Sequence, residues 1–119
     1  MKVILDTNFL IDCIRFRIDI KDELSGNEIY VLDSVMFEID KITQRETQEA
    51  SLARMVLEFI NKNNIMVLES KTKNADKALV AYAREGYAIA TQDKGLKDKV
   101  KRSGGRVFFI RQQSYVVFE

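Results

Sequence analysis

The chain has 119 residues, of which 46% are hydrophobic and 31% charged, with a formal net charge of +1. This length fits one domain spanning residues 1–119, and the balanced charge by itself indicates no partner. The sequence has no histidine and one cysteine, Cys13, which excludes histidine-based triads, HExxH zinc sites and an intrachain disulfide. No signal peptide or membrane span fits the short apolar start, so we expect a cytoplasmic protein.

Strands and helices alternate along the predicted elements. In chain order, the first half predicts a strand at 2–6, a helix at 7–16, a short polar helix or loop at 19–25, a strand at 28–33 and helices at 34–44 and 46–62. The second half predicts a strand at 64–69, a helix at 74–85, a strand at 87–91, a helix at 93–103 and a strand at 106–110. We expect the tail to add an edge strand or to pack on the body.

The strands are continuous apolar runs, which is typical of a parallel sheet covered by helices on both faces. The sequence therefore predicts a three-layer α/β/α domain with a central parallel sheet of about five strands, of Rossmann-like architecture. We expect Thr7 or Asn8 to cap the first helix, and Ser34 to cap the helix at 34–44.

Four acids occur where a strand is followed by a helix. Asp6 ends the first strand, Asp93 follows the strand at 87–91, and Glu38 and Asp76 lie near the starts of their helices. Because the carboxyl ends of parallel strands meet at one edge of a sheet, we expect these carboxylates to converge there. The first strand must then be central, so that the acids beside it can reach Asp6.

Each of these acids also has a purely structural interpretation. Asp6 and Asp93 suit a turn or a helix cap, and Asp76 would complement the dipole of its helix. Glu38 is harder to explain, because helical geometry places it beside Ile42 on the apolar side of its helix. An unpaired buried carboxylate is costly, so Glu38 there would need a cation or a hydrogen-bond donor.

Clustered carboxylates raise one another's pKa unless a cation lies among them. Oxygen ligands without histidine or cysteine favour the hard ions Mg²⁺ and Mn²⁺. Such ions activate water and offset charge on a phosphodiester. The four acids together therefore indicate metal-assisted phosphodiester hydrolysis.

Four stretches contain these acids: VILDTNFLID around Asp6, SVMFEI around Glu38, NADKALVAYA around Asp76 and AIATQDKGLK around Asp93. In their order and spacing they resemble the PIN-domain ribonucleases over nearly the whole chain, although no single stretch is specific. The resemblance implies a PIN-like fold and an endoribonuclease in which these acids bind Mg²⁺ or Mn²⁺ and perform catalysis. It also implies that Asn8 and Thr91 support the site through hydrogen bonds.

Two branches of that family remain open. One contains toxins of the VapC type, which would imply an antitoxin partner, and the other contains nucleases that process ribosomal RNA. Both imply an RNA substrate, and the family is often dimeric. The apolar stripe at 52–59 and the apolar tail at 116–118 exceed what one small sheet covers, which also favours a homodimer.

Basic residues follow Asp93 directly. Lys94, Lys97 and Lys101 are candidates for holding RNA phosphates, although a solvated helix face explains them at least as well. Asp98 is a fifth candidate acid, for which a salt-bridging role at the surface is the favoured interpretation.

Two other functions fit parts of the pattern. A non-catalytic PIN-like scaffold would bind RNA or protein without cleaving it, and loss of an acid would favour it, but all four are present. A phosphatase of the haloacid-dehalogenase type also uses an aspartate at a strand end. That family needs a second aspartate two residues later, where this chain has Asn8.

Overall fold

A six-stranded sheet forms the centre of the computed structural model, which describes all 119 residues. Its strands are β1 (Lys2–Leu5), β2 (Glu28–Leu32), β3 (Met66–Leu68), β4 (Ala88–Ala90), β5 (Val107–Arg111) and β6 (Tyr115–Phe118). They lie in the order β3-β2-β1-β4-β5-β6, and all neighbours are parallel except β5 and β6. The first strand is central, as predicted, with β2 on one side and β4 on the other.

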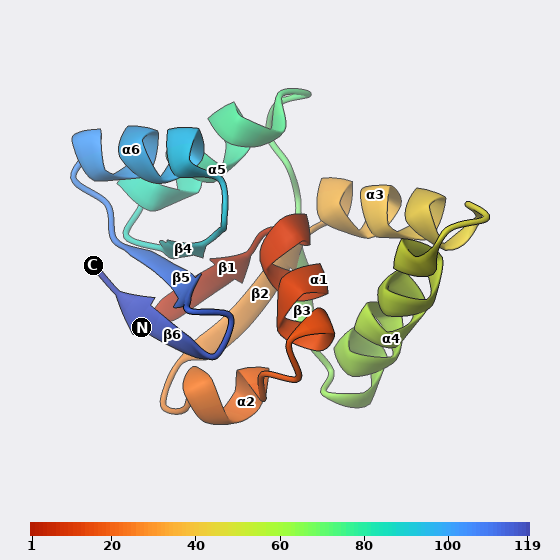
Figure 1. Cartoon of the computed structure of the whole chain (residues 1–119). Coiled ribbons are helices and arrows are strands. Elements are labelled where there is room, and N and C mark those ends of the chain that lie inside the picture. Colours follow the sequence, from red (N-terminus) through yellow and green to blue (C-terminus); the bar gives the residue numbers. More distant parts are fainter.

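Six helices cover this sheet (Figure 1): α1 (Thr7–Arg15), α2 (Ile20–Glu23), α3 (Asp33–Thr43), α4 (Gln48–Lys62), α5 (Ala75–Arg84) and α6 (Lys94–Arg102). The chain builds outward from β1 to β3, then returns to β4 and continues outward to β5. Right-handed crossovers in these two directions place their helices on opposite faces. Accordingly α1, α3 and α4 pack together, while α5 and α6 form a separate pair. The predicted three-layer α/β/α architecture is confirmed.

The core occupies both faces of the sheet and contains 32 buried residues. Val3, Ile4 and Leu5 of β1 are fully buried, which explains why this strand is apolar without alternation. The helix α4 contributes Ala53, Val56 and Ile60 to the core, at the helical spacing that its sequence predicts. No helix has both the length and the apolar composition needed to cross a membrane.

The structure differs from the sequence expectations at several points. The tail forms β6, so the sheet has six strands and its last pair is antiparallel. The cap of α1 is Asp6 rather than Thr7 or Asn8, and α3 begins one residue before Ser34 without any side-chain cap. Asp33 instead accepts hydrogen bonds from the backbone N–H groups of Ser34 and Ser70, which ties the ends of β2 and β3 together.

Glu38 is exposed, contrary to the expectation that it lies on the apolar side of its helix. The buried stripe of α3 is Val35, Ile39 and Ile42. This stripe is narrow because α3 packs mainly against α4, so a residue beside it reaches solvent. Glu38 therefore needs no buried counterion.

Candidate functional site

Asp6 lies where the central strand β1 ends and α1 begins. Its backbone N–H donates to the carbonyl of Ala90, which continues the pairing of β1 with β4. Its Oδ1 accepts from the backbone N–H of Thr7 at 2.9 Å, and its Oδ2 accepts from the Thr91 hydroxyl at 2.9 Å. Each carboxylate oxygen thus has one donor, and the two bonds fix the plane of the carboxylate.

Burial raises the pKa of Asp6, because the protein removes water from the charged form. The hydrogen bonds from Thr91 and Thr7 lower that pKa in part, while the charges of Glu38 and Asp76 raise it. Two of the other predicted acids, one from α3 and one from α5, thus act on Asp6 through their charges, and no hydrogen bond joins either of them to it.

Thr91 connects Asp6 to the start of α6. Its side chain is completely buried, and its Oγ1 both donates to Asp6 and accepts from the backbone N–H of Asp93 at 3.1 Å. The backbone of Thr91 donates to the carbonyl of Phe108 on β5, which holds the residue in the sheet. This one hydroxyl therefore sets the position of a carboxylate relative to the neighbouring βα junction.

Asp93 is exposed and is the N-cap of α6, where its Oδ1 accepts from the backbone N–H of Leu96 at 3.0 Å. Asp93 therefore caps α6, as its position in the sequence suggested. Asp93 is linked to Asp6 through Thr91 and makes no direct hydrogen bond with it.

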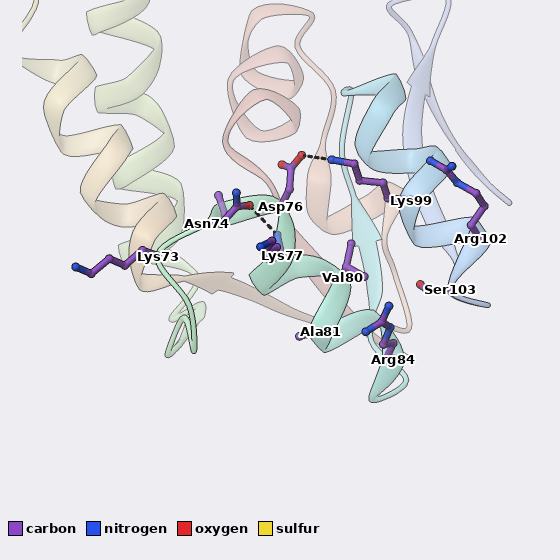
Figure 2. A pocket seen from close by; sticks show the side chains of 11 residues that line it. Lys73, Asn74, Asp76, Lys77, Val80, Ala81, Arg84, Lys99, Arg102 and Ser103 are labelled. Carbon is purple, nitrogen blue, oxygen red and sulfur yellow. Dashed lines mark hydrogen bonds and ion pairs between the residues drawn. The ribbon is translucent and has the colours of Figure 1, made fainter.

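Asp76, in the first turn of α5, forms an ion pair with Lys99 of α6, whose Nζ lies 3.4 Å from Oδ2 (Figure 2). Both side chains are about half exposed, and ion pairs of that kind contribute only about 0–1 kcal/mol. Lys99 therefore offsets the charge of Asp76 but does not hold it firmly.

The acids around Asp6 suit a hard cation in their chemistry, because every donor is an oxygen and the buried carboxylate is destabilised by like charges. Nowhere in the chain, however, are three acids or thiols gathered in a metal-binding arrangement. Closing a ligand shell on Asp6 requires the more exposed side chains of Glu38 and Asp76 to rotate toward it.

The other residues selected from the sequence lie in varied places. Asn8 is exposed and its side chain makes no hydrogen bond, and Asp98 is exposed without an ion pair. Lys97 lies over the ring of Phe109, 4.0 Å from its centroid. The other two lysines that are candidates for RNA binding are Lys94, at the exposed start of α6, and Lys101, which pairs with Glu119.

Sequence reasoning missed a groove between α5 and α6 with a volume of about 1050 Å³ (Figure 2). Its lining includes Asp76 of α5 and Lys99 of α6, which are 23 residues apart in the sequence and pair only in the folded chain. The sequence contained one signal for it, since Lys77 and Arg84 are seven residues apart and share a face of α5.

Comparison with known proteins identifies the fold. A family model described as a PIN-like domain matches residues 3–113. Ribonuclease VapC4 of Methanocaldococcus jannaschii is 27% identical over 96% of this chain and 93% of its own length. The structure of the PIN domain endonuclease Utp24 superposes with a TM-score of 0.81 at 24% identity, over 99% of this chain and 90% of that one. A domain of a functionally unknown M. jannaschii protein gives a TM-score of 0.65 at 19% identity, covering 92% of this chain and 91% of that domain.

Proposed function

The chain belongs to the family of PIN-like domains, and from this membership we propose that it is a metal-dependent endoribonuclease. The relative named as a ribonuclease supports the RNA substrate. The observation that carries the proposal is the buried Asp6 carboxylate at the end of the central strand, oriented by two hydrogen bonds and acted on by two further acids.

In this proposal Asp6 is the principal ligand of Mg²⁺ or Mn²⁺, and Glu38, Asp76 and Asp93 are the other catalytic acids. When bound, the ion would supply an activated water and offset charge on the scissile phosphate. Thr91 keeps the Asp6 carboxylate in one orientation, and the carboxylate is therefore preorganised to bind a metal ion. Asn8 would support the site through hydrogen bonds, as the family resemblance implies, although its exposed side chain makes none in this structure.

Lys99 has a defined task in the same scheme. Its ammonium group offsets the charge of Asp76, and because this half-exposed ion pair is weak, Asp76 would remain available to hold a metal ion. Lys99 would then be available to an RNA phosphate held beside the acids.

The decisive experiment compares Asp6→Asn with a control, Asp40→Asn, which removes an exposed acid of α3 that forms no ion pair. We expect wild type and the control to cleave RNA with Mn²⁺ or Mg²⁺ and to stop when EDTA is added. We expect Asp6→Asn to remain folded in a thermal melt and to lose cleavage.

Full cleavage by a folded Asp6→Asn variant, or cleavage by wild type in EDTA, would contradict the mechanism. A wild type that binds RNA without cleaving it at any metal concentration would favour the second candidate, a PIN-like scaffold that binds RNA or protein. That alternative keeps the fold and the groove but assigns no chemistry to Asp6.

Other features of the proposal come from the sequence and from the family resemblance, and no observation of the structure tests them. A homodimer and, for a toxin, an antitoxin partner stay predictions, as do a cytoplasmic location and phosphate binding by Lys94, Lys97 and Lys101. Half-exposed apolar side chains on α4 and β6, Met55 and Phe118, support an interface with a second copy.

A further inference from the structure

The groove between α5 and α6 concentrates positive charge. Five cations line it, with Asp76 as the one acid among them: Lys73, Lys77, Arg84, Lys99 and Arg102. The lining thus carries a net formal charge of +4, whereas the whole chain carries +1. Such a concentration of like charge in one concave surface attracts a polyanion.

Most of these cations have no acid of the chain as a partner. Only Lys99 forms an ion pair, with Asp76, and the other four form none. Arg102 donates from Nε to the backbone carbonyl of Asp98, which leaves its terminal nitrogens available. A guanidinium in this state is suited to a bidentate contact with phosphate.

The shape of the groove fits a strand. Lys77, Val80, Ala81 and Arg84 follow one another at helical spacing along α5, so two cations flank a small apolar floor. From Asp76 to Arg84 the helix rises about 12 Å. A stacked strand advances about 3.4 Å per nucleotide, so this length accommodates roughly three nucleotides.

The groove also has a direction. Asp76 lines one end, in the first turn of α5 and at the edge of the sheet where Asp6 follows β1, and Lys99 reaches across from α6 to Asp76 (Figure 2). Arg84 and Arg102 lie toward the C-terminal ends of their helices, away from the acids. A strand lying in the groove therefore presents its next phosphate to the carboxylates.

We propose that the α5–α6 groove binds the phosphate backbone of the RNA strand and leads it to the acids around Asp6. This inference rests on the proposed ribonuclease function and assigns to it a substrate path. It favours the groove over the face of α6 that carries Lys97 and Lys101, because four of the five groove cations form no ion pair, whereas Lys97 lies over Phe109 and Lys101 pairs with Glu119.

The test measures binding of a fluorescent single-stranded RNA of twelve uridines in EDTA, where cleavage cannot contribute. The groove variant is Arg84→Glu with Arg102→Glu. The matched control is Lys21→Glu with Lys62→Glu, which changes the net charge equally and affects lysines lining a separate depression. Thermal melts verify that each variant folds. If the charge reversal prevents the groove variant from folding, Arg84→Gln with Arg102→Gln replaces it.

We expect the groove variant to bind at least tenfold more weakly, while the control changes affinity less than threefold. If two phosphate contacts are lost, the slope of log affinity against log salt falls in magnitude by about 1.4. Equal weakening in both variants would overturn the groove assignment.

Further outcomes separate this inference from the proposed function. If wild type cleaves RNA and the groove variant binds and cleaves equally well, the path is wrong and the ribonuclease function stands. If wild type neither binds nor cleaves RNA, both are wrong. If an acidic peptide such as polyglutamate binds in the groove and RNA does not, the groove serves a protein partner and the inference is overturned.

Discussion

Replacing Thr91 with valine removes one hydroxyl from the site while preserving the shape of the side chain. This hydroxyl makes two hydrogen bonds in a fully buried position, one to Asp6 and one from Asp93. Valine can make neither. The variant therefore leaves a carboxylate oxygen of Asp6 without its donor and frees the start of α6.

The two bonds set the size of the effect. A hydrogen bond to an ionised group contributes about 1.5–3 kcal/mol, and a neutral one contributes about 0.5–1.5 kcal/mol. The extra buried methyl of valine recovers about 0.8 kcal/mol. We therefore expect Thr91→Val to lower the free energy of unfolding at neutral pH by about 2–3 kcal/mol.

The matched variant is Thr91→Ser, which keeps the hydroxyl and removes the methyl. Losing one buried methyl costs about 0.8–1.5 kcal/mol. Urea unfolding of both variants gives the stabilities. RNA cleavage across a Mn²⁺ titration gives the functional effect, for which loss of an outer-shell partner predicts a 10- to 100-fold decrease in Thr91→Val. Thr91→Ser should remain within a few-fold of wild type.

The two variants also define what refutes the reasoning. One hydrogen bond contributes ~1 kcal/mol to stability. If the stability of Thr91→Val is within about 0.5 kcal/mol of wild type and exceeds that of Thr91→Ser, the hydrogen bonds of the hydroxyl contribute little and packing holds the site. If Thr91→Val loses the expected stability but cleaves RNA at the wild-type rate, the hydrogen bond to Asp6 is structural and catalysis does not require it to position the carboxylate.

Three other predictions follow from the buried and exposed groups. Because burial raises the pKa of Asp6, its ionised form penalises folding. The penalty is absent below the ordinary value of 3.8, grows between that value and the raised folded-state value, and is constant above it, so the Tm of Asp6→Asn relative to wild type should increase from about pH 3.5 to pH 7. A constant difference across that range would contradict the burial argument. Burial, together with the charges of Asp12 and Glu23, raises the pKa of Cys13 to about 12, so iodoacetamide should modify this thiol in urea but not in the native protein at about pH 8. Light scattering at tens of micromolar should give a dimer mass, and Met55→Lys should reduce it if α4 forms the interface; a monomer in wild type would count against the homodimer.

Much of the architecture follows from the sequence alone. The five parallel strands are apolar runs separated by helical periods, and that pattern is local, so it is readable without knowing which segments meet. The central place of β1 follows in turn from the carboxylates expected to surround Asp6. The sequence does not decide whether the tail forms a sixth strand. A tail with apolar residues can pair with a sheet edge or pack on a face, and the local pattern does not distinguish these outcomes.

The contacts that determine how the site works were decided by tertiary structure. The exposure of Glu38 depends on how much of α3 is covered by α4, which helical periodicity does not specify. The bond from Thr91 to Asp6 joins residues 85 apart, and the pair of Lys99 with Asp76 joins residues 23 apart. Sequence separation of this size carries no local signal, because the side chains meet only after two βα units have packed on the same sheet. The sequence thus determined which carboxylates follow strands or begin helices in the chain, and only the packing of α5 against α6 created the positive groove.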